Sequence, residues 1–326
     1  MTIPEYLAEP LVSIVLATNR NSEFLDETLK SVSVQSWQNW ELIIVDDGGP
    51  NPSALDELAK DLPNCMVVHR PHGGVSMARN IGIAASHGEL LVFLDDDDIW
   101  HPDRLRRQVA ELSRDPDAVA CYSSGWHLDA FGAKIPGGWP PTGATREQLL
   151  SGEVGIPKIV TMMVRREPCI AVGCFNPAIW LGEDNEWILR LLRYGRFTCS
   201  PDALAGYRHH GSNATGAPLV EHAVWSGRAI LLQLWAAEAR ANDDDLRLMR
   251  QNMRTFRRGL AERSVGDALG SVKSGHALRA SGEFARAFAW SAPRAATVAA
   301  TRLGRFARRR VRTQRGSGVA RNGGLS

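Results

Sequence analysis

The first hundred residues alternate short apolar runs with segments of helical spacing, and this alternation limits the fold more than any other feature. The apolar runs are Val12–Thr18, Glu41–Val45, Cys65–His69 and Glu89–Leu94. The segments predicted to be helical are Ser22–Ser36, with Ser22 as N-cap, Pro52–Leu62 and Gly74–Ser86. Apolar strands that alternate with helices indicate an α/β fold with a mostly parallel sheet covered on both faces. Ligands bind such sheets beyond the carboxyl ends of the strands.

The pattern becomes less regular after about residue 100. We expect helices over His101–Ser113 and Glu183–Tyr194, and strands over Ala118–Ser123, Ile159–Val164 and Ala203–His209. Residues 125–157 are rich in Gly and Pro and read as a long loop region. Trp126, Trp139 and Trp180 fall in loop-like sequence, where they could stack on a sugar ring or simply be core or lid residues.

The C-terminal third has a different composition. From Pro218 the chain reads as helical, and Asp267–Arg302 fits a helical hairpin with Gly282 at its turn. Residues 301–326 contain eight arginines and no acid, which predicts a disordered basic tail. This region could lie on an anionic membrane surface or pack on the rest of the chain. We find no aromatic-interleaved module for nucleic acid.

Overall composition places the chain among globular proteins. Hydrophobic residues make up 44% of the 326 residues and charged residues 23%. The five cysteines include no C-x-x-C pair, which favours a reducing compartment. The N-terminus lacks the pattern of a signal peptide, and no run of eighteen apolar residues occurs. We therefore expect a cytoplasmic protein, with attachment to the inner face of the membrane as an alternative.

Three acidic features mark where chemistry could occur. Asp46–Asp47 follow one apolar run directly, Asp95–Asp98 follow another, and Glu183–Asp184 open a later helix. Four adjacent carboxylates repel one another, and a cation relieves that repulsion. Oxygen ligands suit Mg²⁺ or Mn²⁺, and such an ion completes its shell with substrate phosphates. The pattern favours a metal-bound nucleotide diphosphate, although a solvated acidic turn or a helix N-cap at Asp98 is the simpler alternative.

Four segments, in this order, resemble the family-2 glycosyltransferases. They are VSIVLATNRNSEFLDETLKSVSVQSWQNWELIIVDDGG, GGVSMARNIGIAASHGELLVFLDDDDIWHPDRL, LGEDNEWILRLLRYG and YRHHGSNAT. The resemblance covers roughly residues 11–215. It implies a GT-A fold with a catalytic domain over residues 1–216, in which residues 11–100 bind the nucleotide-sugar and residues 101–216 bind the acceptor. A helical region over 217–300 and the tail over 301–326 would follow.

The resemblance also implies roles for residues near the nucleotide. Thr18 lies where the first strand meets the nucleotide, and Asp46 matches the acid that contacts the base or ribose, with Asp47 beside it. Arg79 lies on the helix next to the nucleotide site. The family's Pro-Thr-Tyr is Ala17-Thr18-Asn19 here, so an aromatic that could cover the base is missing.

The remaining roles concern the metal and the chemistry. Asp95 and Asp97 match the family's D-x-D, with the ribose assigned to Asp95 and the metal to Asp97, while Asp96 could share either role. His210 matches a histidine that reaches the metal or pyrophosphate in some relatives, although a shift of one residue would exchange it with His209. Asp184 matches the catalytic base.

These assignments predict an inverting glycosyltransferase that uses a divalent metal and a UDP-sugar to glycosylate a glycan or lipid-linked acceptor. Cell-surface polysaccharide or glycolipid synthesis would fit such a reaction. Two alternatives remain: a catalytically inactive nucleotide-sugar-binding protein of the same fold, and a sugar nucleotidyltransferase. The first loop, ATNRNSE, lacks the glycines of a nucleotidyltransferase loop.

Overall fold

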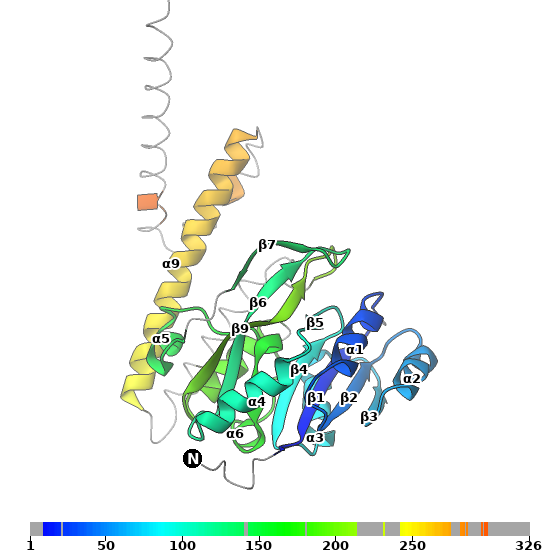
Figure 1. The fold of residues 1–326 in the computed structure, drawn as a ribbon. Coiled ribbons are helices and arrows are strands. Elements are labelled where there is room, and N and C mark those ends of the chain that lie inside the picture. The colour runs from blue at the N-terminus through cyan, green and yellow to red at the C-terminus, as the bar shows by residue number, and fades with distance from the viewer. Residues whose placement is uncertain are drawn as a thin grey trace, which may run out of the picture. The chain divides into compact units, whose positions relative to one another are not determined.

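The computed structural model contains a nine-stranded sheet among the residues that it describes (Figure 1). The described residues are 9–20, 22–139, 143–179, 181–213, 231, 242–274, 281–283, 285, 295 and 297–298. The strand order is β3-β2-β1-β4-β8-β6-β9-β5, and β7 pairs with β6. Within these ranges no helix is long and apolar enough to cross a membrane.

The first half of the sheet is parallel, as the sequence predicts. Its strands are β1 (Val12–Thr18), β2 (Trp40–Asp47), β3 (Cys65–Arg70) and β4 (Leu90–Asp95). The helices between them are α1 (Leu25–Ser33), α2 (Pro52–Lys60) and α3 (Val75–Ala85). The register aligns Thr18 with Asp46 and Ala17 with Asp95. The polar residues that end these three strands therefore meet at one edge of the sheet.

The two faces of these strands pack on different helices. Ile14 and Leu16 lie in a buried cluster with residues of α1, α2 and α4 (Arg104–Arg114). Val15 and Phe93 face the opposite way, into a cluster that contains Trp187 of α7 (Glu183–Leu191). Because both faces are covered, apolar residues occupy nearly every strand position, which explains the continuous apolar runs.

The second half of the sheet is mixed. It contains β5 (Ile99–Trp100), β6 (Ala120–Leu128), β7 (Lys134–Trp139), β8 (Met163–Arg165) and β9 (Phe197–Arg208), together with α5 (Arg146–Ser151), the 3₁₀ helix η2 (Ile159–Thr161) and α6 (Arg166–Ala171). β8 runs antiparallel to both β4 and β6, whereas β9 runs parallel to β6. β8 therefore joins the parallel half to the rest of the sheet.

The prediction of a long loop over residues 125–157 is wrong. This segment completes β6, forms β7 and contains α5, so Trp126 and Trp139 lie on strands; Trp180 lies outside the described residues. A Cβ on Gly125 would lie 2.2 Å from the Trp139 ring, and one on Gly206 would lie 2.6 Å from the Trp126 indole. These two glycines make room for tryptophan rings on the sheet, and do not end strands.

Other boundaries also differ from the predictions. Residues 159–161 form η2 before the short strand β8, and β9 begins at Phe197, not at residue 203. The N-cap of α1 is Phe24, and Ser22 lies two residues earlier. Asp98 does not cap a helix, because β5 follows it and α4 begins only at Arg104.

The chain divides into two compact units, residues 1–250 and 251–326. The helix α9 (Asp243–Lys273) contributes Leu246 and Met249 to the core of the first unit, where Arg146 also pairs with Asp245 at 2.8 Å. In the second unit Ser271 donates a hydrogen bond to Glu283. Gly282 is helical and so does not form the predicted hairpin turn, and the basic tail lies outside the described residues.

Candidate active site

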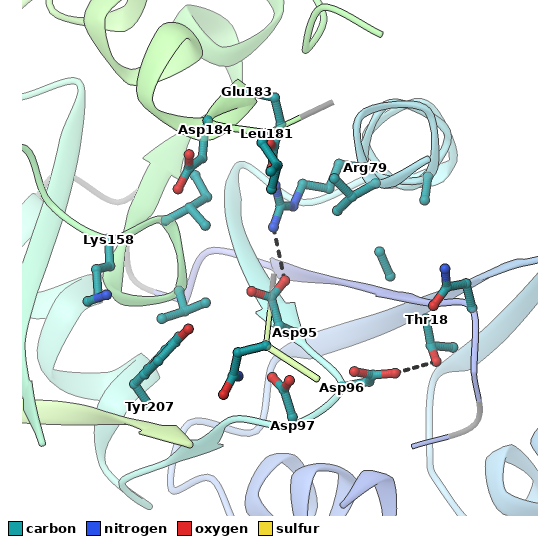
Figure 2. Close-up of a pocket in the computed structure, with 18 of the residues that line it drawn as sticks. Thr18, Arg79, Asp95, Asp96, Asp97, Lys158, Leu181, Glu183, Asp184 and Tyr207 are labelled. Atoms are coloured by element: carbon teal, nitrogen blue, oxygen red, sulfur yellow. Dashed lines mark hydrogen bonds and ion pairs between the residues drawn. The ribbon is translucent and has the colours of Figure 1, made fainter. Parts of the chain in front are cut away.

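A cavity of about 550 Å³ opens at the edge of the sheet where the parallel strands end (Figure 2). Its wall includes Thr18 at the end of β1, Asp47 at the end of β2 and Asp95–Asp97 at the end of β4. The opposite wall brings Lys158, Glu183 and Asp184 from segments more than sixty residues farther along the chain. In Figure 2, Thr18 and Asp96 lie at one end of the cavity and Lys158, Tyr207 and Asp184 at the other, with Asp95 between them.

Arg20 neutralises the acidic end. Its Nη2 lies 3.1 Å from Asp96 Oδ1 and 2.7 Å from Asp97 Oδ2. Asp96 also accepts a hydrogen bond of 2.6 Å from the Thr18 hydroxyl, and Asp97 Oδ2 lies 2.8 Å from His210 Nε2. Burial raises the pKa of Asp96, but Thr18 and Arg20 oppose that shift. The loops that follow β1 and β9 are thus joined through these carboxylates.

Arg79 links the middle of the cavity to α7. The side chain is 5% exposed, and its two terminal nitrogens contact Asp95 at 2.9 Å and Glu183 at 2.7 Å. Burial opposes the charged form of Arg79, but Asp95 and Glu183 outweigh it and raise its pKa. Burial also raises the pKa of Glu183, and the adjacent guanidinium opposes that shift. Arg79 is therefore a positioning residue for both carboxylates.

Packing of α7 fixes where its acidic first turn lies. Trp187 is fully buried, its ring centroid is 5.7 Å from that of Phe93 on β4, and its Nε1 donates to the Gly173 carbonyl at 3.0 Å. Such aromatic pairs contribute about 0.5–1.5 kcal/mol beyond area burial. Asp184, three residues earlier, is half-buried and accepts hydrogen bonds from the backbone and side-chain nitrogens of Asn185. Its carboxylate lines the cavity with no ion pair to another described residue.

Asp98 differs from its three neighbours. It is fully buried and accepts a 3.0 Å hydrogen bond from the Arg208 backbone, and its Oδ2 has no partner among the described residues. Burial and the charges of Asp97 and Asp95 hold the pKa of Asp98 well above its usual range. Only Asp95, Asp96 and Asp97 of the four face the cavity.

The acids that end β2 also separate. Asp46 is buried, accepts from the Gly49 backbone at 2.7 Å and lies 2.8 Å from His69, and it is not part of the cavity wall. Asp47 lines the cavity and accepts from the backbone N–H groups of Gly73 and Gly74 at 3.0 and 2.7 Å. Asp47 therefore fixes the turn that leads into α3.

The residues at the acidic end fit a divalent ion shared with a diphosphate. Adjacent ligands of an octahedral ion lie about 3 Å apart, close to the 2.8 Å between Asp97 Oδ2 and His210 Nε2. Within the described part of the chain, no group of three His, Cys, Asp or Glu side chains is arranged to hold a metal. An ion bound at Asp97 and His210 would take its remaining ligands from substrate phosphates and water. His209 turns away instead and lies 2.8 Å from His127.

Comparison with known proteins identifies the family. The model for Glycosyl transferase family 2 matches residues 13–173, a segment that includes β1–β4 and the acids that follow them. Residues 13–173 belong to glycosyl transferase family 2.

Relatives and solved structures agree with this family. An uncharacterized glycosyltransferase of Rickettsia felis is 24% identical over 212 residues, or 63% of this chain and 35% of that protein, so the chain spans about a third of that relative. S. aureus TarS 1-349 in complex with UDP-GlcNAc superposes with a TM-score of 0.63 at 15% identity, over 90% of this chain and 92% of that one. The mannosyltransferase PcManGT of Pyrobaculum calidifontis, in complex with GDP-Man and Mn²⁺, gives 0.57 at 16% identity over 90% and 80%. The GT-A fold predicted from the sequence is confirmed.

The cavity brings together most of the site residues that the sequence predicted. Thr18, Asp47, Arg79, Asp95–Asp97 and Asp184 line one cavity, His210 contacts it through Asp97, and only Asp46 is turned away. The sequence analysis missed Arg20, Lys158 and Tyr207. Arg20 was within reach of prediction, because β1 and β4 are neighbours and a cation after one would meet the acids after the other.

Proposed function

We propose that this protein is an inverting glycosyltransferase that moves a sugar from a nucleotide-diphosphate donor to an acceptor hydroxyl. The observation that carries the proposal is the cavity itself, which holds the three carboxylates at the end of β4 on one side and, on the other, the carboxylate of Asp184, which forms no ion pair with a described residue. A donor bound at the acidic end would present its anomeric carbon toward Asp184. A hydroxyl attacking from the side of Asp184 would invert that carbon.

Each end of the cavity would have a separate task. Asp184 would accept the proton of the attacking hydroxyl, a role typically worth about 10²–10⁴-fold in rate. Asp97 and His210 would hold a divalent ion, which when bound neutralises the diphosphate leaving group. Thr18, Asp95 and Asp96 would contact the nucleoside and sugar of the donor.

The donor that we favour is a UDP-sugar. One structural neighbour is a complex with UDP-GlcNAc and another is a complex with GDP-Man and Mn²⁺, so both nucleotides are candidates for this fold. We further propose a glycan or lipid-linked acceptor, cell-surface polysaccharide or glycolipid synthesis, and a location in the cytoplasm or on the inner face of the membrane. The basic tail, with its eight arginines, supports the membrane contact.

Calorimetry with UDP, GDP and dTDP, each with and without Mn²⁺, tests the donor site. We expect metal-dependent binding of one nucleotide, followed by sugar-dependent nucleotide release from the corresponding donor. If the nucleotide binds but the donor releases none, with water or with added acceptors, the alternative of a catalytically inactive binding protein is favoured. If the folded protein binds none of the three with Mn²⁺ present, the proposal is wrong.

Asp97→Ala tests the assignment of the metal. The nucleotide affinity of this variant should lose its dependence on Mn²⁺, because the ion loses its carboxylate ligand. Asp115→Ala serves as a control, since its carboxylate pairs with Arg196 outside the cavity. Unchanged metal dependence in Asp97→Ala would remove the residue from this role.

A further inference from the structure

Lys158 differs from the other cations of the cavity wall in forming no ion pair with a described residue. The described residues that line the cavity include three cations, Arg20, Arg79 and Lys158. Arg20 pairs with Asp96 and Asp97, and Arg79 pairs with Asp95 and Glu183. The Lys158 ammonium makes no ion pair or hydrogen bond with any described residue, and only its backbone carbonyl is bonded, to Thr161.

Aromatic rings hold the Lys158 ammonium in place. Its Nζ lies 4.4 Å from the ring centroid of Tyr207 on β9 and 5.2 Å from that of Trp139 on β7. The two rings meet edge to face with centroids 6.4 Å apart. A cation–π contact positions an ammonium but leaves its net charge in place. Lys158 therefore presents a fixed positive charge to the cavity.

Two histidines lie beside the same aromatic rings. His127 lies 2.8 Å from His209, and its ring contacts those of Trp139 and Tyr207. Burial, together with the nearby His209 and Lys158, lowers the pKa of His127. Burial and these two neighbours therefore hold His127 toward its neutral form beside the Lys158 ammonium.

Lys158 lies away from the end of the cavity where we propose that the donor diphosphate binds. Figure 2 places it with Asp184 and Tyr207, away from Thr18 and Asp96. We propose that Lys158, with Tyr207 and Trp139, forms an acceptor subsite for an anionic group, a phosphate or a carboxylate carried by the acceptor near its reactive hydroxyl. This inference rests on the proposed glycosyl transfer. Lysine binds phosphate as a point charge, and the Tyr207 ring, which lines the cavity, can stack on the acceptor.

Calorimetry on the full chain tests the subsite directly. With UDP and Mn²⁺ filling the donor end, the protein is titrated with sn-glycerol 3-phosphate, D-glucuronate and, as neutral probes, glycerol and methyl glucoside. We expect at least one anionic probe to bind and the neutral probes to bind more weakly. The difference between phosphate and glucuronate identifies the anion.

Variants then assign the charge. Lys158→Met should lower the affinity for the anionic probe at least tenfold, and Lys158→Arg should keep most of that affinity. Lys134→Met is the matched control, because Lys134 lies 4.7 Å over the Trp126 ring but does not line the cavity. It should bind like the parent protein, and UDP affinity should be the same in all variants.

Three results would overturn the subsite: no anionic probe binds, Lys158→Met binds it as tightly as the parent, or Lys158→Met weakens UDP instead. Failure of the proposed function is a different result, namely that UDP does not bind the parent protein. In that case the same probes, titrated without UDP into the parent protein and Lys158→Met, still decide whether Lys158 holds an anion.

Discussion

The two ends of the cavity are lined by different kinds of side chain. The donor end consists of carboxylates at the tips of parallel strands, and Arg20 and Arg79 already pair with them. The proposed acceptor end consists of the Lys158 ammonium, the rings of Tyr207 and Trp139 that hold it, and the carboxylate of Asp184, which forms no ion pair with a described residue. At the donor end, a metal ion could replace an arginine that already pairs with the carboxylates. At the acceptor end, Lys158 and Asp184 are available to a substrate.

This contrast separates binding from chemistry. Ligands at the donor end must compete with internal ion pairs, so removing a pair should change affinity. Groups at the acceptor end have no such competitor, so removing one should change turnover or acceptor binding and leave the nucleotide unaffected. The predictions below use that separation.

The largest effect is expected from Asp184→Asn. Turnover should fall by about 10²–10⁴-fold, because the amide cannot accept the hydroxyl proton, while the affinity for UDP and Mn²⁺ should stay the same. Nucleotide release and calorimetry measure the two quantities. Asp117→Asn, in which an 84% exposed carboxyl is changed, is the control. Near-normal turnover in Asp184→Asn would show that the base lies elsewhere.

Arg79→Met should break the link between the two ends. Loss of one partner leaves Glu183 and Asp95 without their buried counter-ion, and such losses cost about 3–5 kcal/mol in the free energy of unfolding. Urea denaturation measures this cost. Arg107→Met is the matched control, because the Arg107 side chain is 34% exposed, against 5% for Arg79, and such exposed pairs contribute about 0–1 kcal/mol. Equal losses in the two variants would contradict a special role for Arg79.

Arg20→Gln should increase the affinity of the donor end for Mn²⁺. The guanidinium contacts the same Asp97 oxygen that His210 contacts, so it competes with a metal for that oxygen. The pair is partly exposed and is worth about 1 kcal/mol at most, which predicts up to about fivefold tighter binding of Mn²⁺ alone. The spectroscopic signal of free Mn²⁺ reports this without turnover. Weaker Mn²⁺ binding in the variant would mean that Arg20 supports the ion.

The smallest effect concerns His69, behind the donor end. Hydrogen bonds with Asp46 and Asp56 raise its pKa above the ordinary 6.5. A raised folded-state pKa stabilises the protein below pH 6.5, and that contribution is lost as the pH rises through the folded value. The melting temperature of His69→Gln should therefore approach that of the parent protein above this range. Parallel curves of melting temperature against pH would refute the prediction.

The parallel half of the fold follows closely from the sequence. Strands buried on both faces need continuous apolar runs, and β1, β2, β3 and β4 show them. In the mixed half, the glycines led to the wrong prediction of a loop, because glycine occurs both in turns and in strands where a large side chain packs closely. In β6 and β9, Gly125 and Gly206 make room for Trp139 and Trp126, contacts between residues distant in sequence that no local pattern reveals.

The site divides in the same way. Asp95–Asp97 were predictable because strand ends in one parallel sheet converge, and Asp184 came from the resemblance to the family. Lys158 was not predictable, because it precedes a 3₁₀ helix in a segment without a motif, and β7 and β9 supply the rings that hold it. Asp46 and Asp47 look equivalent in sequence, and only the pleat decides that Asp47 faces the cavity.

Arg79 has a consequence for how such a protein could acquire new acceptors. Its guanidinium joins Asp95 to Glu183, residues that belong to different halves of the catalytic fold. A chimera that takes its acceptor half from a relative would retain this joint only if the incoming helix begins with a carboxylate at the same place. The strand β7 lies outside this contact and pairs with β6 off the main path of the sheet, so it could be exchanged more freely. Modular diversification should therefore concentrate on that strand.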